Sequence, residues 1–466
     1  MPEPWARHRA RPGLWSTGGD GVTEVDRQWG VVAVQGEEDV LAGEDVLDRE
    51  LRPELSDLNR TARPSALADP AAELSYRSDD LATARLDSVA ARALELGLRR
   101  VQVLAWRDFE DPEAGGSELH AHRMAQAWAR AGVDIAMRTS AVPGTQAVSS
   151  RDGYTVIRKS GRYGVFPRSA MSGMVGRRGR PDGLIEIWNG MPFFTPLWAR
   201  CPRIVFLHHV HAAMWRMVLT PRLARVGEAI ELRLAPPVYR HSRVLTPSPS
   251  SRAEILSMLG LDASRVSVVS PGVDARFVPG GTRSPVPLVL AVGRLVPVKR
   301  LELLVDTLAR ARQSVPGLRA LIVGEGYERP RLEAKIKAVG GTSWIDLAGH
   351  VSDDDLAEAY RSAWVLASTS LREGWNMTIT EAAACGTPAV VSDIAGHRDA
   401  LTHGVSGLLV EPGDEFVDAL VRVLTDVGLR ESLARGAIAR ARNLTWDATA
   451  ATVLGALVEE TEARRQ

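Results

Sequence analysis

Two glutamates lie eight residues apart in the segment Glu373-Gly-Trp-Asn-Met-Thr-Ile-Thr-Glu381, a spacing that could bring both carboxylates to one ligand. The residues that follow keep a helical pattern, which stops at Gly386. Glu373 then falls on the loop before the helix and Glu381 about two turns into it, at roughly 10 Å separation. Free backbone N–H groups at the start of a helix suit a phosphate. The residues expected to supply them are Gly374, Trp375, Asn376 and Met377. Alone, the two carboxylates would be typical of a solvated helix surface.

A second chemical signal is the pair Arg294 and Lys299 in the segment Ala291-Val-Gly-Arg-Leu-Val-Pro-Val-Lys299, where an apolar strand runs through Gly293 into a loop. Arginine offers a planar fork of donors and lysine a mobile point charge. Together they could neutralise a diphosphate that gains negative charge as a bond to it breaks. A basic loop at the end of a strand is the alternative if this segment is considered by itself.

Such residues need strands and helices to hold them, and the chain has the required pattern after its first hundred residues. Val101–Ala105 is strand-like, a loop with Gly115 and Gly116 follows, and Glu118–Ala131 has a helical pattern. A strand, a glycine-rich loop and a helix in this order are typical of phosphate-binding βα units. The two glycines could let backbone approach a ligand without a Cβ in the way, and a plain turn is the alternative.

Two series of short apolar runs alternate with helical patterns, which predicts two parallel sheets. Further strands of the first series are expected at Val133–Arg138, Tyr154–Arg158, Leu184–Ile187, Ile204–Leu207, Val244–Thr246 and Val266–Val269. The second series is expected at Leu288–Val292, Ala320–Val323, Ile345–Leu347, Trp364–Ala367, Ala389–Ser392 and Gly407–Val410. The Pro/Gly-rich stretch Pro279–Pro287 separates them, as a linker would. We therefore expect an α/β protein with two facing Rossmann-like, doubly wound domains and one cleft between them.

The expected domain boundaries follow from these patterns. Residues 99–280 form the first domain, 281–445 the second, and 446–466 a C-terminal helical segment. Residues 1–98 carry mixed charge with an acidic excess, several prolines and few sustained apolar patterns, which predicts a largely disordered extension. The helix-like Leu81–Leu98 is an exception within it.

Composition favours a globular protein of a reducing compartment. The 466 residues carry no net charge, and the only two cysteines, Cys201 and Cys385, lie far apart without metal-site or redox spacing. No signal peptide or apolar run of about 18 residues is evident, so we expect a cytoplasmic location. The first domain is basic. That surface could attract phosphate, nucleic acid or anionic lipid, and scattered solvated arginines explain it equally well.

With these motifs placed, the sequence resembles the retaining glycosyltransferases of family 4, whose two Rossmann-like domains form the GT-B architecture. The resemblance covers about residues 99–450. It is carried by AGGSE (114–118), HHVH (208–211), TPSPSSRAEI (246–255), SPGVDARF (270–277), AVGRLVPVK (291–299), VGEGYERPRLE (323–333), LAGHVSDDDLAEAY (347–360) and REGWNMTITEAAACGTPAVVSD (372–393). Eight landmarks in one order are far more specific than any one of them. The resemblance also implies that the C-terminal helix from Trp446 crosses back to the first domain.

The resemblance implies a role for each chemical residue. Arg294 and Lys299 would contact the diphosphate of a nucleotide-sugar donor and Glu381 its ribose hydroxyls. Glu373, with the backbone amides after it, would hold the transferred sugar. A histidine at the end of the Ile204–Leu207 strand would lie near that sugar, and His208 is our candidate. Three histidines in HHVH also suggest a metal site, but no carboxylate motif or cysteine cluster accompanies them, so we expect none.

Two departures from the family pattern affect the sugar pocket. Asn376 stands where the family usually has glycine or proline, and Arg300 follows Lys299 where glycine is common. Asparagine tolerates unusual backbone angles, so the phosphate cradle can survive.

The acceptor side is expected in the first domain. The segment EIWNGMPFFTP offers Glu186 and Asn189 after a strand, with core packing as the alternative for its aromatic residues. The basic and apolar segment Arg162–Arg180, including Arg168, could meet a lipid-phosphate acceptor or an anionic membrane, and an ordinary surface helix is the alternative.

The sequence thus predicts a retaining glycosyltransferase that moves a sugar from a nucleotide-diphospho-sugar to a hydroxyl of a glycan, glycolipid or small glycoside. We expect no required cofactor, no metal and no nucleic-acid partner. A sugar-nucleotide epimerase or phosphorylase of the same architecture is the rival enzyme. A non-catalytic carbohydrate- or lipid-binding module is the rival of another class.

Overall fold

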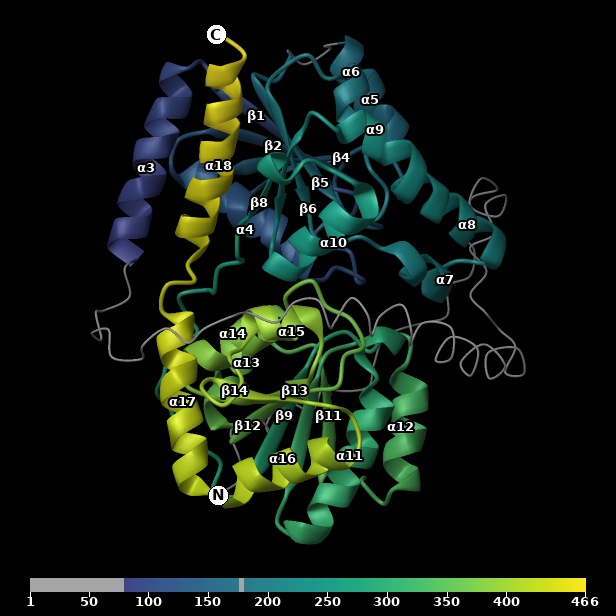
Figure 1. The fold of residues 1–466 in the computed structure, drawn as a ribbon, viewed down its shortest axis with the longest axis vertical. Helices are drawn as coiled ribbons and strands as arrows, with labels where there is room; N and C mark the ends of the chain where they lie inside the picture. The colour runs from purple at the N-terminus through teal and green to yellow at the C-terminus, as the bar shows by residue number, and fades with distance from the viewer. Residues whose placement is uncertain (1–78, 176–179) are drawn as a thin grey trace. The chain divides into compact units, whose positions relative to one another are not determined.

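The computed structural model describes residues 79–175 and 180–466, all of which belong to one compact unit of the chain (Figure 1). The described residues build two mostly parallel sheets, and separate hydrophobic clusters pack on the two faces of each sheet. The predicted α/β class is confirmed. Predictions about residues 1–78 lie outside the described residues.

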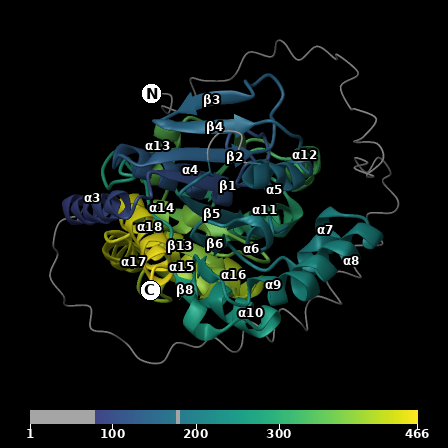
Figure 2. The same ribbon diagram turned by 90° about the horizontal axis from the view of Figure 1, so that it is seen from above.

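The first sheet has the strand order β3-β4-β2-β1-β5-β6-β7-β8 (Figure 2). Its strands are β1 (Arg100–Leu104), β2 (Asp134–Thr139), β3 (Val148–Arg151), β4 (Tyr154–Arg158), β5 (Gly183–Trp188), β6 (Arg203–Leu207), β7 (Arg243–Thr246) and β8 (Val266–Val268). All neighbours pair in parallel except β3, which is antiparallel to β4. The seven predicted strands are confirmed to within about a residue or two at their ends.

The sequence prediction missed β3, and the turn that follows shows why the strand is there. Asp152 and Gly153 join β3 to β4 with φ values of +44° and +86°. Two left-handed residues in succession match the twist of a tight hairpin, and Asp-Gly is among the sequences that favour it. The polar, half-exposed side chains of β3 lack the apolar run that marked the other strands.

Helices cover both faces of the first sheet. One face carries α3 (Asp79–Glu95), α4 (Gly116–Arg130) and α18 (Trp446–Ala463). The other face carries α5 (Val165–Val175), α6 (Thr195–Trp198), α9 (Ala235–Tyr239) and α10 (Pro249–Leu259). The shorter elements between β6 and β8 are η2 (Ala212–Met214), α7 (Trp215–Val218), α8 (Pro221–Ala229), the π-helical turn η3 (Ile230–Leu234) and η4 (Ala263–Arg265).

Helix α3 corrects the boundary expected at residue 98. Leu86, Ala90 and Ala93 are fully buried in the core of the first domain, where α3 lies beside α18 (Figure 1). The Thr83 hydroxyl also donates to Asp447 of α18, at 2.6 Å. The helix-like pattern noted over Leu81–Leu98 is thus confirmed, but the helix belongs to the first domain rather than to an extension, because its apolar stripe completes the core beneath α18.

The second sheet has the strand order β11-β10-β9-β12-β13-β14, parallel throughout. Its strands are β9 (Leu288–Val292), β10 (Arg319–Val323), β11 (Ile345–Gly349), β12 (Val365–Ser368), β13 (Ala389–Ser392) and β14 (Gly407–Val410), which confirms the six predicted ones. Its helices are η5 (Pro297–Lys299), α11 (Leu301–Ser314), α12 (Arg329–Ala338), α13 (Asp353–Ser362), α14 (Met377–Ala384), α15 (Ala395–Ala400), α16 (Asp414–Thr425) and α17 (Val427–Ala441).

The chain crosses between the two sheets twice at one place. Val273 and Thr445 form an isolated parallel bridge where the chain leaves the first sheet and where it returns. A Cβ on Gly272 would lie 2.3 Å from the backbone nitrogen of Trp446, so only glycine fits beside the returning strand. From there α18 packs on α3 and α4, which confirms the predicted return of the C-terminal helix.

Each sheet has a point where the strand order reverses, and these points position the candidate site. In the first sheet the chain winds outward from β1 on one side and from β5 on the other, and in the second sheet from β9 and β12. Ligands of doubly wound sheets bind outside the carboxyl ends of the strands at such points. The loops after β1, β9 and β12 carry most of the residues that the sequence singled out.

Candidate active site

A pocket opens at the carboxyl ends of β9 and β12. Gly293, Arg294, Lys299 and Ser368–Ser370 line it. Gly293 has a φ of +154°, and a Cβ at this position would lie 3.2 Å from Cε of Lys299. The glycine therefore allows the lysine to fold back across the strand end and into the pocket.

Lys299 meets Glu373 in this pocket. Its Nζ lies 2.6 Å from Oε1 of Glu373, and both side chains are more than four-fifths buried. The hydroxyl of Ser370 donates to the same oxygen at 2.8 Å. Burial opposes ionisation of Glu373, but the charge of Lys299 and these hydrogen bonds lower its pKa below the ordinary value. Glu373 is therefore ionised at neutral pH and holds the ammonium group of Lys299 in the pocket.

Glu381 lies about one turn into α14, which begins later than the sequence indicated, and has a different environment. The hydroxyl of Tyr360 donates to its Oε2 at 2.7 Å. Burial raises the pKa of Glu381 to about 7, although the Tyr360 hydrogen bond opposes this, and the nearby carboxylates of Asp274 and Asp353 add to the rise. Glu381 therefore exchanges its proton near neutral pH, unlike Glu373.

Both departures from the family pattern fall on left-handed backbone. Arg300 has a φ of +48° and Asn376 a φ of +74°. Glycine adopts this region without strain and asparagine tolerates it, which explains the glycine that the family prefers. The Arg300 guanidinium donates to the carbonyl of Thr369 at 2.8 Å, and Nδ2 of Asn376 lies 2.9 Å from Nε2 of His397. These side-chain contacts hold the strained turns at both edges of the pocket.

The loop after β1 reaches the same pocket from the first domain. The Arg294 guanidinium donates to the carbonyl of Glu113 at 2.9 Å. A Cβ on Gly115 would lie 3.2 Å from Nε of Arg294, and one on Gly116 would lie 3.4 Å from Cε of Met377. The two glycines thus allow the close approach that the sequence indicated, rather than serving only as a plain turn.

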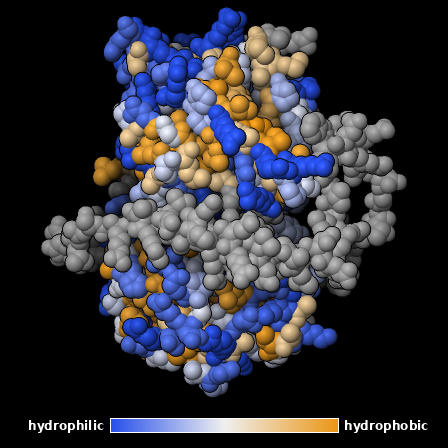
Figure 3. Space-filling model, turned by 45° about the vertical axis from the view of Figure 1, so that its right-hand side comes forward, coloured by the Kyte–Doolittle hydropathy of each residue, from blue (hydrophilic) through white to orange (hydrophobic). Residues whose placement is uncertain are grey.

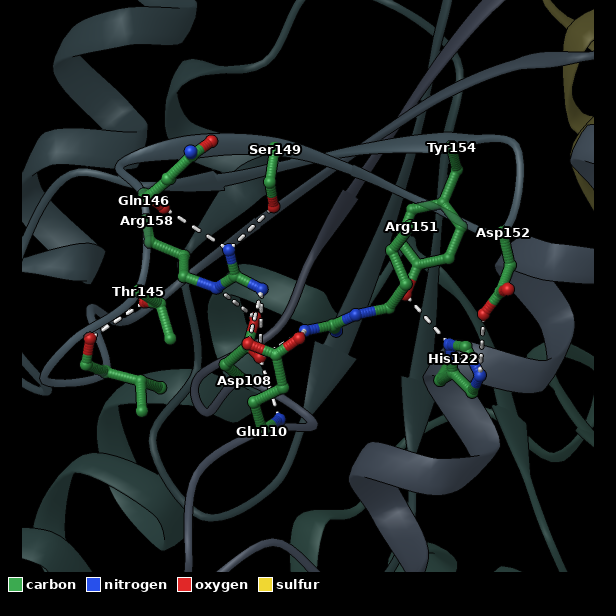
Figure 4. A network of polar contacts seen from close by, with 11 residues as sticks. Asp108, Glu110, His122, Thr145, Gln146, Ser149, Arg151, Asp152, Tyr154 and Arg158 are labelled. Atoms are coloured by element: carbon green, nitrogen blue, oxygen red, sulfur yellow. Dashed lines mark hydrogen bonds and ion pairs between the residues drawn. The ribbon is translucent and has the colours of Figure 1, made fainter.

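A network of buried charges holds this loop (Figure 4). Asp108 is fully buried between the guanidinium groups of Arg151 and Arg158, at 2.8 and 3.0 Å. Glu110, on the same loop, pairs with both arginines. The arginines lie at the two ends of the β3–β4 hairpin, so the strand missed in the sequence helps to fix the loop that meets Arg294.

The histidines after β6 divide between two faces. Phe206 and His208 point toward α4, because strand side chains alternate, and Nε2 of His208 lies 3.2 Å from Nδ1 of His120. Burial lowers the pKa of His208 to about 3, so it is neutral. His209 points the opposite way, and its Nδ1 would lie 3.7 Å from a Cβ on Gly374.

The ring of His209, rather than that of His208, therefore lies beside Gly374, in the segment expected to hold the transferred sugar. Burial lowers the pKa of His209 well below its ordinary value, and the charges of Arg372 and Arg294 act in the same direction. Its buried Nε2 has no hydrogen-bond partner among the described residues. The alternation of side chains beyond the Ile204–Leu207 strand was the signal that could have identified it.

The backbone groups expected to hold the donor lie around Gly374. A Cβ on Gly374 would lie 3.1 Å from the carbonyl of His208, so this glycine is needed for the approach of the two loops. The Trp375 side chain is 6% exposed and belongs to the core of the second domain, where it anchors the segment. Met377 is the first residue of α14, so the first N–H groups of this helix have no partner within the helix.

Two of the expected acceptor residues have other partners. Glu186 is fully buried and accepts hydrogen bonds from Thr195, Tyr239 and the backbone of Phe193, at 2.5 to 2.7 Å. It ties β5 to α6 and α9, and contact with an acceptor was the wrong expectation. Arg162 is 38% exposed and pairs with Asp111 and Glu113, so it holds the loop after β1.

The other two acceptor candidates differ from these in their surroundings. The Asn189 amide donates to the hydroxyl of Ser117 at 2.8 Å, which places it at the start of α4 beside the candidate site. Arg168 is exposed on α5 and has no ion pair among the described residues.

In residues 79–175 and 180–466 no group of three or more histidine, cysteine, aspartate or glutamate side chains could hold a metal ion. The acidic run Asp353–Asp355 forms the first turn of α13, where negative charge stabilises a helix, and the hydroxyl of Ser352 caps this helix by accepting the N–H of Asp355. Among the described helices, none is both long and apolar enough for a membrane span.

Comparison with known proteins agrees with this geometry. A D-inositol 3-phosphate glycosyltransferase of Kribbella flavida is 34% identical over 242 residues, which are 47% of this chain and 57% of the relative. The chain thus spans little more than half the length of this curated relative. One of the same name from Pseudarthrobacter chlorophenolicus is 28% identical over 404 residues, 77% of this chain and 94% of the relative.

Solved structures and family models complete the comparison. Sucrose-phosphate synthase from Thermosynechococcus elongatus superposes with a TM-score of 0.65 at 20% identity, over 76% of this chain and 97% of that one, which shows the same two-domain fold. The model described as Glycosyltransferase Family 4 matches residues 114–277, and the model described as Glycosyl transferases group 1 matches residues 275–440. Since the two matches follow one another across both sheets, the chain belongs to the family 4 glycosyltransferases of GT-B fold.

Proposed function

We propose that this protein is a retaining glycosyltransferase that transfers a sugar from a nucleotide-diphospho-sugar to a hydroxyl group, without a required metal or other cofactor. The observation that carries the proposal is the convergence of Arg294, Lys299 and Glu373 on one pocket at the β9/β12 reversal point. The two cations suit the diphosphate and the carboxylate suits the sugar, which are the two groups joined by the bond that would break.

The cations serve the leaving group. As the bond from sugar to diphosphate breaks, negative charge grows on the phosphate oxygens, and fixed positive charges in a buried site stabilise it. A hydrogen bond to the carbonyl of Glu113 orients Arg294, and the contact with the Glu373 carboxylate orients Lys299. Their positive charge supplies the neutralisation that a divalent cation provides in other enzymes.

The remaining groups orient the donor. Glu373 accepts hydrogen bonds from the sugar, and the backbone amides that follow it donate hydrogen bonds to the sugar. The ring of His209, whose Nε2 has no partner among the described residues, lies beside Gly374 in the same segment. Glu381 accepts from the ribose hydroxyls in its ionised form. With Glu373 held by Lys299 and Ser370, the acceptor hydroxyl approaches from the face of the leaving group, which retains the anomeric configuration.

The acceptor is a hydroxyl-bearing glycan, glycolipid or small glycoside bound by the first domain. Asn189 at the start of α4 is the acceptor candidate that lies beside the site. The relatives named D-inositol 3-phosphate glycosyltransferase make a phosphorylated polyol the first acceptor to test.

Removal of the charged pair tests the proposal. Lys299→Ala and Glu373→Ala should each lower kcat for transfer by about 10²–10³-fold, the range seen when one charge-stabilising group is lost. Lys335→Ala is the matched control, since Lys335 pairs with Asp306 on the helices α12 and α11, away from the pocket. Near-normal turnover in either pocket variant, with unchanged circular dichroism, would refute the assignment.

The rival enzymes differ in their products. An epimerase would release an altered nucleotide-sugar, and a phosphorylase would release a sugar phosphate, so chromatography of the reaction mixture separates both from a glycosylated acceptor. A thermal-shift series with UDP-, GDP- and ADP-sugars then identifies the donor base.

A peripheral position on the cytoplasmic face of a membrane is part of the same proposal, supported by the surface of α5 and α6. Met171, Met174 and Leu197 are 62%, 56% and 70% exposed, and Arg168 lies on the same helix as the methionines. Figure 3, turned toward this side, shows hydrophobic side chains gathered beside strongly hydrophilic ones. Apolar and cationic side chains together suit an anionic lipid surface.

Co-sedimentation with vesicles tests this surface. Wild type should bind phosphatidylglycerol-containing vesicles and not pure phosphatidylcholine, and Met171→Ser with Met174→Ser should weaken the binding several-fold. Val427→Ser, at an equally exposed position on α17, should have no effect. Binding that is independent of anionic lipid removes the membrane from the proposal.

A further inference from the structure

A buried carboxylate outside the donor pocket supports the loop that carries His209. Glu231 is fully buried in η3 and accepts three hydrogen bonds. The donors are the backbone N–H groups of His211 and Ala212, at 2.8 and 2.9 Å, and Nε1 of Trp215 at 3.0 Å. One side chain thus holds three points of the segment 211–215.

The loop needs such support, because its backbone is strained. Ala212 has a φ of +44°, in the left-handed region that is unfavourable for a residue with a Cβ. The η3 turn is π-helical, and such turns inside longer helices are often found at functional sites because they redirect a side chain.

Trp215 is seated by two glycines. A Cβ on Gly190 would lie 3.0 Å from the indole, and one on Gly227 would lie 2.7 Å from it. The indole therefore keeps Glu231 and the loop in one arrangement, with little room for an alternative rotamer.

The loop in turn contacts the sugar-binding segment of the second domain. The Arg372 guanidinium donates to the carbonyl of Val210 at 2.8 Å. The carbonyl of His208 and the ring of His209 both lie against Gly374. Any shift of residues 208–212 would therefore be felt at Arg372–Gly374, next to Glu373.

We propose that Glu231 is a positioning residue for sugar transfer: its ionised carboxylate sets the loop 208–212 against Arg372–Gly374, and protonation of Glu231 loosens this part of the donor site. The proposal rests on the function proposed above. Arg372 is the charged group that acts on Glu231 from the second domain. His211, the titratable side chain on the bound loop, has its pKa lowered to about 3 by burial and stays neutral above that pH.

A proton at Glu231 would be taken up in an accessible pH range. Burial raises the pKa of Glu231 to about 6, and the hydrogen bonds from His211, Ala212 and Trp215 limit the rise. Above that pH all three donors face an anion. Below it, one oxygen carries a hydrogen and no longer accepts as well, which weakens the hold on the loop.

The variant Glu231→Gln tests this directly, because its amide is neutral at every pH and places an NH₂ group where an oxygen accepted. At pH 7.5 the donor KM should rise about tenfold, the scale of one hydrogen bond to a charged group. The ratio of the variant KM to the wild-type KM should fall toward one as the pH drops from 7.5 to 5. A ratio cancels the titration of Glu381, which both proteins share.

Two further proteins make the result specific. Glu228→Gln is the matched control, since Glu228 lies one turn earlier and pairs with Arg216 at the surface of α7 and α8. Trp215→Phe removes one donor from the carboxylate, so the midpoint of the wild-type pH dependence should move upward. This variant also covers the case in which Glu231→Gln fails to fold.

Hydrogen exchange of the peptide 208–216 gives a readout that needs no transfer activity. At pH 7.5 the variant should lose protection relative to wild type, and at pH 5 the two should be alike. Equal protection at both pH values, or a KM ratio that does not change with pH, overturns the positioning role. If the variant loses protection but the wild type transfers no sugar, Glu231 still holds the loop 208–212, and the proposed function is refuted instead.

Discussion

The two glutamates of the candidate site, Glu373 and Glu381, have pKa values shifted in opposite directions. Lys299 lowers the pKa of Glu373, so this carboxylate is ionised throughout the neutral range. Glu381, enclosed beneath Tyr360, has a pKa of about 7 and is only partly ionised there. Under the proposed function, the two carboxylates would have different tasks: Glu373 would be a fixed charge beside the donor, and Glu381 an exchangeable acceptor for the ribose.

The donor KM should therefore depend on pH through Glu381. A neutral carboxyl accepts poorly from ribose hydroxyls, so KM should rise as the pH falls below about 7 and the group gains its proton. Glu381→Gln should have a raised KM at pH 8 and a flatter profile between pH 6 and 8. Steady-state kinetics with a saturating acceptor measure both, and an unchanged profile in the variant would contradict the assignment of Glu381.

The same residue makes a prediction for the free protein. Because the folded pKa of Glu381 lies above its unfolded value of about 4.5, its stability contribution is present below pH 4.5 and is lost as the pH rises through about 7. Between pH 5 and 8, wild type should lose stability relative to Glu381→Gln. Urea unfolding at the two pH values tests the sign.

Among the elements, the turn before α14 carries the backbone that is proposed to hold the donor. Asn376 holds a left-handed conformation and is tied to His397. Asn376→Ala should lower the free energy of unfolding by about 1–2 kcal/mol through backbone strain. Asn376→Gly should lose only the side-chain contact and retain more donor affinity. Equal losses in both variants, by thermal shift with and without donor, would show that the backbone angle is not what matters.

The elements also show where sequence reasoning succeeds. Buried parallel strands are apolar on both faces, so runs such as Leu288–Val292 could be recognised without any tertiary information. The half-exposed β3 carries no such run, and the Asp152–Gly153 turn was the signal that marked it. Helix α3 was assigned to an extension because it is buried by packing against α18. That helix is more than 350 residues away in the chain, so the contact cannot be recognised from the local sequence.

Site residues were predictable where motif and strand end coincide. Arg294, Lys299 and Glu373 meet as expected, since loops after neighbouring strands of a parallel sheet share an edge. Glu186 was misjudged because burial by α6 and α9 depends on tertiary packing. The partners of Arg162 belong to a loop about 50 residues earlier, so the sequence around Arg162 does not indicate them.

Over the whole compact unit, α3 and α18 complete the first domain from opposite ends of the chain. Removal of residues 1–95 should destabilise the protein by about 3 kcal/mol or more relative to removal of residues 1–78, since burial of one leucine alone contributes about 1.5–3 kcal/mol. Leu86 lies at the centre of this contact. Urea unfolding of the two truncated chains measures the difference. Equal stabilities would show that α3 is not part of the folded domain.

Contacts between the two sheet domains favour a site assembled from both. Besides the Arg294–Glu113 contact, Arg372 pairs with Glu254 of α10 at 2.7 Å, and Ser250 donates to Asp399 of α15. Polar contacts of this kind are typical of domains that separate and close around a ligand.

The most direct measurement of the account is the anomeric configuration of the product. Proton NMR would follow wild-type protein with an α-linked nucleotide-sugar and D-inositol 3-phosphate as the first acceptor, in buffer with EDTA. A retaining transferase gives an α-linked glycoside, with one nucleoside diphosphate released per transfer. If every donor that binds in the thermal-shift series gives a β-linked product, or sugar released to water alone in the presence of acceptors, the central claim is contradicted.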